Sequence, residues 1–290
     1  MTVSQQPLTT TASPGWKVLD EGDGEGVVLA VDFAASGRPE STFTELAGLL
    51  DPRLPMWETR QPAPDDARLF HGEDFVAHWA QAVRTAGRPV RAVLGYCVGG
   101  LYAARLAQHV STWQDTAPLV LLLDPEPPTV PGMTADFRAA ISRLSSVLTA
   151  QETDLAAAAA EEAAHDFTAF PDLGAGLVKI FDDIARAAFD RAGLPAELAD
   201  ELSTAYGAFV SYIAAASAFD PAPLWTTATA VTSTGADPHA RHAGHRLRVD
   251  VAHDDILRST LTADLVSGLL LQPPSAPRDT VGGHRSSGKG

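Results

Sequence analysis

The sequence predicts an α/β protein in which helices cover both faces of a mostly parallel central sheet. Short apolar runs of strand length alternate with segments whose apolar residues recur at helical spacing. Several of these runs are apolar at nearly every position, as expected for strands buried on both faces of a sheet. Helical sequence alone fills residues 130–222, which indicates an insertion into this alternation.

The elements of the sheet domain follow one another in the order of a parallel sheet with helical crossovers. Apolar or β-branched runs predict strands at 27–33, 55–59, 90–95, 119–123, 226–233 and 246–251. Helical spacing predicts helices at 41–50, 73–85, 99–108 and 256–270. The strand at 55–59 is the weakest of these assignments, because its apolar pattern is short.

The alternation stops after the apolar run that ends at Asp124. Four helices are predicted in succession, at 136–149, 152–167, 173–191 and 196–218. An insertion of this kind over the functional face of a sheet is typical of a lid. We therefore expect a core of residues 15–129 and 223–271, a helical lid at 130–222, and disordered polar ends at 1–14 and 272–290.

The composition excludes some classes of partner. Lys and Arg number 21 against 36 Asp and Glu, a formal net charge of -15 in a chain of 290 residues. Such a charge repels nucleic acid and anionic membranes, so neither is expected as a partner. With one cysteine, no intrachain disulfide can form. The start lacks the basic and apolar regions of a signal peptide, and no apolar run has the roughly 20 residues of a membrane helix, so we expect a cytoplasmic protein.

The most informative motif is Gly95-Tyr96-Cys97-Val98-Gly99, which lies between a predicted strand and a predicted helix. This G-x-C-x-G pattern is typical of a nucleophile elbow, with cysteine in place of serine. The two glycines leave room for the adjacent strand and helix. The backbone N–H of Val98 would face the same space as the sulfur and stabilise an oxyanion. The helix N-terminus would favour the thiolate form of Cys97.

A nucleophilic cysteine needs a base and a group that orients the base. His253 follows a predicted strand and precedes a helix, and the order nucleophile, acid, base is that of α/β hydrolases. Two residues compete for the acid. Asp124 ends an apolar strand, where a carboxylate is costly to bury and is not expected unless it has a functional role. Asp237 follows the next strand. We favour Asp124 and keep Asp237 as the alternative.

The chain resembles the thioesterases that release products from polyketide and non-ribosomal peptide assembly lines. The resemblance covers about residues 16–270 and rests on the motifs GYCVGG, LLLDPEPP and VAHDDIL, with a weaker match in VDFAASGRPESTF. It implies an α/β-hydrolase fold with a helical lid and the catalytic set Cys97, Asp124 and His253. It also implies that the turn near Ser36 supplies a second oxyanion N–H, beside that of Val98.

The sequence departs from this family in two places: cysteine replaces the usual serine, and Ala252 stands before the histidine where glycine is frequent. Cysteine occurs in a minority of these thioesterases, some of which close strained rings. The motif also resembles dienelactone hydrolases, which use Cys, Asp and His but have a shorter chain without the long insertion. That match is the second hypothesis.

The resemblance implies no resident cofactor: the substrate would be carried on the phosphopantetheine of an acyl or peptidyl carrier protein. His239, His242 and His245 recur at every third residue, but their polar, glycine-containing surroundings favour a loop over a metal site. The expected reaction is hydrolysis, cyclisation or acyl transfer in natural-product biosynthesis, and the sequence does not choose among the three. A non-catalytic small-molecule binder is the alternative from another class.

Overall fold

The computed structural model describes residues 14–33, 40–62, 71–235 and 238–272. Its centre is a seven-stranded sheet in the order β1-β3-β2-β4-β5-β6-β7. Six of these strands are parallel, and β1 at one edge runs antiparallel to β3. The strands are β1 (Trp16–Asp20), β2 (Val27–Val31), β3 (Met56–Thr59), β4 (Val90–Tyr96), β5 (Leu119–Leu123), β6 (Thr229–Thr232) and β7 (His245–Arg248). The predicted parallel sheet is confirmed.

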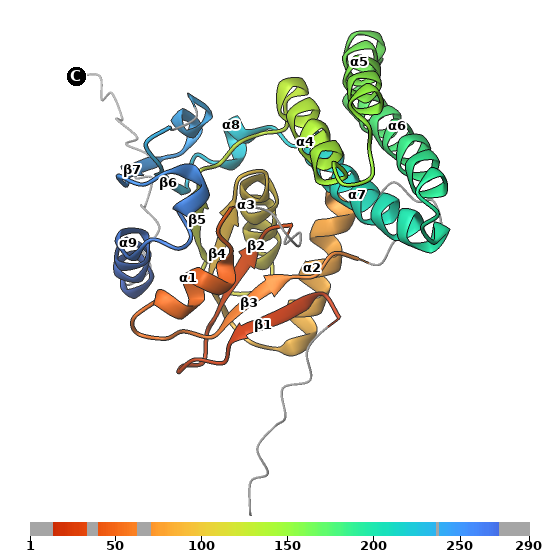
Figure 1. Ribbon diagram of the computed structural model, residues 1–290. Helices are drawn as coiled ribbons and strands as arrows, with labels where there is room; N and C mark the ends of the chain where they lie inside the picture. Colours follow the sequence, from red (N-terminus) through yellow and green to blue (C-terminus); the bar gives the residue numbers. More distant parts are fainter. Residues whose placement is uncertain (1–13, 34–39, 63–70, 236–237, 273–290) are drawn as a thin grey trace, which may run out of the picture.

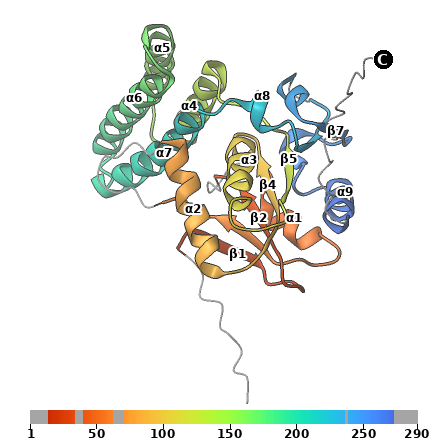
Figure 2. The same ribbon diagram turned by 180° about the vertical axis from the view of Figure 1, so that it is seen from behind.

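Helices cover both faces of the sheet, as predicted (Figures 1 and 2). Strand β2 explains this need for helices on both faces. Its alternate residues point to opposite faces of the sheet, and all five are buried. Val27, Leu29 and Val31 belong to the core under α2 (Gly72–Ala86) and α3 (Gly99–Val110). Val28 and Ala30 belong to the core under two other helices. These are α1 (Phe43–Leu49) and α9 (Thr260–Leu271).

The chain between β5 and β6 is helical. It comprises α4 (Val130–Arg143), α5 (Ala150–Asp166), α6 (Phe170–Arg191), α7 (Ala196–Ala216) and the short α8 (Pro221–Leu224). Helices α5 and α6 extend away from the sheet to one side, whereas α7 returns to it (Figure 1). Helices α6 and α7 pack along each other, with Phe181 stacked on Tyr206 at a ring-centroid distance of 4.5 Å.

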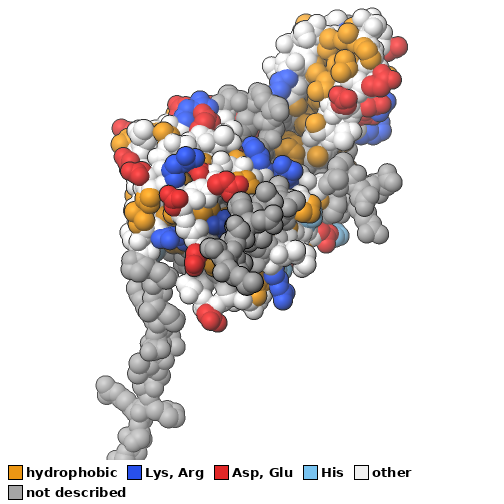
Figure 3. Space-filling model, turned by 90° about the horizontal axis from the view of Figure 1, so that it is seen from below, with side chains coloured by type: hydrophobic (Ala, Val, Ile, Leu, Met, Phe, Trp, Pro, Cys, Tyr) orange, Lys and Arg blue, Asp and Glu red, His pale blue; other side chains and the backbone are white. Residues whose placement is uncertain are grey.

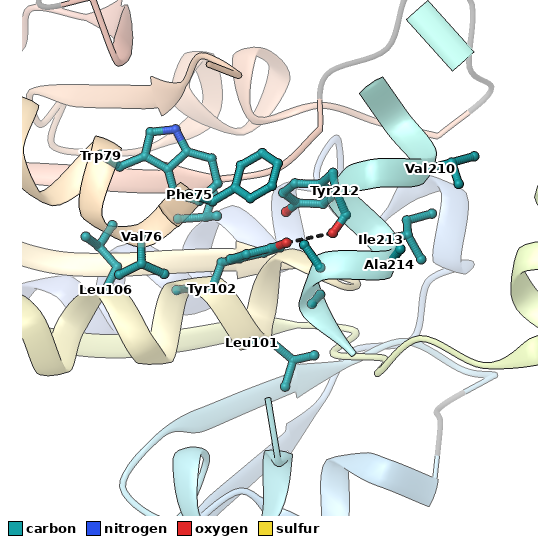
Figure 4. Packing of buried hydrophobic residues seen from close by; sticks show 14 of the residues in the cluster. Phe75, Val76, Trp79, Leu101, Tyr102, Leu106, Val210, Tyr212, Ile213 and Ala214 are labelled. Carbon is teal, nitrogen blue, oxygen red and sulfur yellow. Dashed lines mark hydrogen bonds between the residues drawn. The ribbon is translucent and has the colours of Figure 1, made fainter. Parts of the chain in front are cut away.

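Aromatic side chains fix the insertion to the sheet domain. Tyr212 of α7 stacks on Tyr102 of α3 at a centroid distance of 4.6 Å, and Phe75 and Trp79 of α2 contact both rings (Figure 4). The Tyr102 hydroxyl donates a hydrogen bond of 2.6 Å to the carbonyl oxygen of Tyr212. Buried aromatic pairs of this kind contribute about 0.5–1.5 kcal/mol each beyond their buried area. The end of α7 is therefore held firmly at the sheet domain.

One element was missed and the start of another was predicted wrongly. The edge strand β1 was not predicted, because its sequence WKVLD lacks the continuous apolar run of the central strands; only its two end residues are buried. The first helix of the insertion begins at Val130, six residues before the predicted start. Thr129 caps it by accepting a hydrogen bond of 3.1 Å from the Gly132 N–H, and Pro131 fits the first turn, where its missing N–H is not needed.

The surface carries charges of both signs over the sheet domain, and hydrophobic side chains gather on the protruding part at the upper right of Figure 3. Leu155, Leu194, Leu198 and Leu202, all within the insertion, are exposed. Within the described ranges, no helix combines the length and apolar character that crossing a membrane would require.

Candidate active site

Cys97 lies in the sharp turn that joins β4 to α3. Its φ of 50° is in the left-handed region, which non-glycine residues rarely adopt. Its N–H donates to the Leu123 carbonyl oxygen at 3.0 Å, and its own carbonyl accepts from the Gly100 N–H at 3.0 Å. A side chain held in this conformation between a strand and a helix is the geometry that a nucleophile elbow requires.

The glycines around Cys97 are required by close backbone approach, as predicted. A Cβ atom on Gly95 would lie 2.5 Å from the Gly99 carbonyl oxygen. A Cβ atom on Gly99 would lie 2.2 Å from the carbonyl oxygen of Val31 on the neighbouring strand β2. Neither contact can be relieved by moving a flexible side chain, since both involve backbone atoms.

We expect Gly99→Ala to destabilise the protein by about 1–3 kcal/mol or more, because β2 or α3 must shift to admit the methyl group. Urea unfolding followed by circular dichroism measures this change. The control is Gly268→Ala on the exposed side of α9, where a Cβ meets no atom within 4 Å. This control should be neutral or slightly stabilising, by up to about 1 kcal/mol. Equal stability of the two variants would contradict the expectation.

Asp124 and His253 form a hydrogen-bonded pair at the carboxyl edge of the sheet. His253 Nδ1 lies 2.9 Å from Asp124 Oδ2, and the other carboxylate oxygen, Oδ1, accepts from the Ser233 N–H at 2.7 Å. Asp124 is buried and has a φ of 43°, a second left-handed residue at the site. The hydrogen bond to Asp124 raises the pKa of His253, and partial burial opposes this rise. Since an ionised carboxylate only accepts, Nδ1–H donates and Nε2 is left as the basic atom of the neutral ring.

The thiol of Cys97 has an acidic environment. Burial is the largest cause that raises the pKa of the thiol, and the negative charges of Glu126, Asp32 and Asp136 raise this pKa further. The backbone N–H of Val98 acts in the opposite direction by hydrogen bonding to the sulfur. The start of the helix thus acts in the predicted direction, through the Val98 N–H, but desolvation and the neighbouring carboxylates outweigh it, and the net shift of the thiol pKa is upward. In the absence of a ligand the group is a thiol.

These carboxylates come from separate segments. Asp32 directly follows β2 and is buried; Glu126 follows β5, and its N–H lies 3.4 Å from the Cys97 carbonyl oxygen. Asp136 lies on α4, and burial together with Glu40 and Glu126 raises its pKa to about 6. None of these three carboxylates was predicted to lie at the site, because no short motif joins residues so far apart in the chain.

Tyr96 was also missed, although it is part of the elbow motif. Its hydroxyl lies 2.9 Å from His253 Nε2, the atom expected to face the thiol. Across the described residues, no hydrogen bond joins Cys97 to His253. The structure thus brings Asp124, His253 and Tyr96 into one hydrogen-bonded chain, and Cys97 follows Tyr96 directly in sequence.

The remaining candidates divide into two groups. Ser36 and Asp237 lie outside the described residues. His239 and His242 belong to the short turn Pro238–His242, and His245 begins β7. Over the ranges that the structure describes, no group of three or more His, Cys, Asp or Glu side chains could hold a metal ion.

Comparison with known proteins gives a likeness of fold. No protein-family model and no curated protein matches the chain. The NocB thioesterase domain, solved as a covalent complex with a fluorophosphonate nocardicin G analog, is 17% identical and has a TM-score of 0.51; the match covers 89% of this chain and 100% of that domain.

Two further solved structures are less similar. The Vlm2 thioesterase domain bound with a dodecadepsipeptide is 17% identical over 88% of this chain and 97% of that chain, with a TM-score of 0.48. The enol-lactonase from Burkholderia xenovorans LB400 is 14% identical over 89% of this chain and 96% of that chain, with a TM-score of 0.48.

The chain has the α/β-hydrolase fold. The strand order with an antiparallel first strand, the elbow between β4 and α3, and the helical insertion after β5 agree with this assignment.

Proposed function

We propose that this chain is a thioesterase-like enzyme that takes an acyl or peptidyl chain from a carrier-protein thioester onto Cys97. The observation that carries the proposal is the left-handed backbone of Cys97 at the elbow, with the Val98 N–H at its sulfur and with the Asp124–His253 pair hydrogen-bonded to the preceding residue, Tyr96. Nucleophile, oxyanion donor, base and orienting acid are the parts that acyl transfer needs. The fold shared with the NocB thioesterase domain agrees with this assignment.

The reaction runs in two acyl transfers. The proton of the Cys97 thiol passes to His253 Nε2, and the sulfur attacks the thioester carbonyl while the Val98 N–H stabilises the oxyanion. The carrier's sulfur leaves and takes the proton from His253. Water, or an amine or hydroxyl of the acyl chain or of a separate acceptor, then attacks the Cys97 thioester. His253 accepts the proton of that nucleophile and returns it to the Cys97 sulfur.

Cysteine changes the energetics of the second transfer. A serine would form an oxoester, which loses the activation of the thioester. Cys97 keeps a thioester, so transfer to a weak nucleophile or closure of a strained ring stays favourable. For this reason cyclisation and transfer to an acceptor stand beside hydrolysis in the proposal. The protein needs no resident cofactor in this scheme, since the carrier's phosphopantetheine presents the substrate.

The test is the intact mass of the protein after exposure to an acyl-N-acetylcysteamine thioester, a small mimic of acylated phosphopantetheine. We expect one acyl group on the wild type, and neutral hydroxylamine should remove it because it cleaves thioesters readily. Cys97→Ser is the matched control: any adduct on it is an oxoester and should resist hydroxylamine. Since the chain has one cysteine, the adduct needs no further assignment to a thiol.

Three results would redirect the proposal. Turnover of free lactones without any reaction with thioesters would favour the dienelactone-hydrolase type. Binding of small acyl compounds without adduct or turnover would favour a non-catalytic binder. A hydroxylamine-resistant adduct on the wild type would place the acyl group on a residue other than Cys97.

A further inference from the structure

Tyr96 is held rigidly beside His253. It is the last residue of β4 and pairs with Leu123 of β5, so the sheet fixes its backbone. Its side chain is 3% exposed and packs in the core that contains Ile256 and Leu257, just after the histidine. The phenol and imidazole rings are stacked at a centroid distance of 5.3 Å and an interplanar angle of 23°. The tyrosine therefore has little freedom, and its position constrains that of the imidazole.

Both nitrogens of the imidazole are engaged. Nδ1 lies 2.9 Å from Asp124 Oδ2, and Nε2 lies 2.9 Å from the Tyr96 hydroxyl. The same hydroxyl lies 3.5 Å from the His253 carbonyl oxygen, a longer and weaker contact. In the neutral ring Tyr96 donates to Nε2, and in the protonated ring Nε2–H donates to Tyr96. In either form the basic nitrogen is occupied by the phenol.

The resting thiol has no base bonded to it. The Cys97 sulfur accepts from the Val98 N–H, and among the residues described no bond connects it with His253. The other charged groups that act on His253 are carboxylates: Asp124 on the ring itself, Asp254 next to it in the chain, and Glu126 after β5. They raise the pKa of His253. The arrangement thus leaves the only cysteine of the chain unactivated.

We propose that Tyr96 is a positioning residue that holds the basic nitrogen of His253 on its hydroxyl, so that the Cys97–His253 pair forms only when this hydrogen bond breaks. This inference rests on the proposed function. When the bond breaks, the proton of the thiol moves to Nε2, the sulfur attacks the thioester, and the departing carrier thiol takes the proton from Nε2. The phenol keeps its own proton throughout. Between turnovers the hydrogen bond protects Cys97 from adventitious alkylation and oxidation, since thiols react as thiolates.

The test is the rate of Cys97 alkylation by iodoacetamide as a function of pH, in the full chain without substrate. Tyr96→Phe removes the hydroxyl and keeps the ring. We expect it to react about tenfold faster than the wild type near pH 7, because the freed Nε2 can accept the thiol proton and a tenfold rise corresponds to about one pKa unit. The gain should disappear in Tyr96→Phe combined with His253→Ala.

Two controls separate this role from a purely structural one. Tyr102→Phe also removes a buried hydroxyl, one that bonds to the Tyr212 carbonyl and does not contact His253, and it should leave the alkylation profile unchanged. Thermal unfolding of each variant shows whether a change in rate follows from lost structure.

A wild-type profile in Tyr96→Phe, or slower alkylation, would overturn the proposal, as would a gain that persists without His253. These measurements use no acyl substrate. If Tyr96→Phe accelerates alkylation but no thioester reacts with the wild type, then the positioning role stands and the proposed function fails. The reverse result leaves the proposed function and removes the role of Tyr96.

Discussion

Cys97→Ala is expected to lower the turnover of acyl thioesters by about 10⁴–10⁶-fold, to the level that oxyanion stabilisation and binding alone can support. The reason is the loss of the covalent route: without sulfur, water must attack the thioester directly, and no acyl group is stored on the protein. Release of N-acetylcysteamine, followed with a thiol reagent after the protein has been removed, measures the loss. A variant that kept a tenth or more of the activity would show that another residue is the nucleophile.

The left-handed backbone at Cys97 allows a second, independent test, which compares the stability of two variants at this position. In ordinary helix or strand positions glycine is less stable than alanine by about 0.5–1 kcal/mol. At a φ of 50° the order should reverse, because the left-handed region costs a residue with a Cβ about 1–2 kcal/mol. We therefore expect Cys97→Gly to unfold at higher urea concentration than Cys97→Ala, with both variants inactive. If Cys97→Ala is instead the more stable of the two, as at an unstrained position, then the elbow relaxes when the sulfur is removed.

Local sequence predicted the elbow and the sheet because the determinants there are themselves local. The glycines two residues before and after Cys97 leave room for atoms of the adjoining helix and strand, and the run that ends at Asp124 is apolar at all of its positions. The place of Asp124 followed from the same reasoning, since a carboxylate that ends a buried strand lies at the carboxyl edge of the sheet, where ligands bind.

The electrostatics of the site could not be predicted in this way. The expected lowering of the thiol pKa considered only the helix that follows Cys97. The opposing charges come from Asp32, Glu126 and Asp136, and only the folded chain brings them to the sulfur. The contact between Tyr96 and His253 joins residues 157 positions apart. Tyr96 did offer one indication, because a buried tyrosine ring carries a hydroxyl that needs a hydrogen-bond partner. The sequence alone does not show which residue that partner is.

Asp124→Asn is expected to lower turnover by about 10⁴-fold while leaving the fold intact. The reason lies in the two hydrogen bonds of the carboxylate. Oδ1 accepts from the Ser233 N–H and Oδ2 accepts from His253 Nδ1–H. Asparagine has one oxygen for these two donors. If it keeps the bond to Ser233, its NH₂ group faces Nδ1, which must then accept. The imidazole proton moves to Nε2, and the base is lost.

The pH dependence of the same variant separates this tautomer effect from general damage. In the wild type the bond to Asp124 raises the pKa of His253, so the acid limb of the rate profile should lie above the ordinary histidine value of about 6.5. Protonation removes the base, so the rate falls as the pH falls through that raised pKa. Without the carboxylate charge the pKa of His253 drops, and the acid limb of the residual activity should move to lower pH.

Asp20→Asn is the matched control. Asp20 is also buried and also accepts a hydrogen bond from a backbone N–H, that of Gly22 at 2.7 Å. It pairs with Arg53, however, rather than with His253. That variant should lose some stability and keep both its turnover and its acid limb. An unmoved limb in Asp124→Asn would mean that another group sets the protonation of the base.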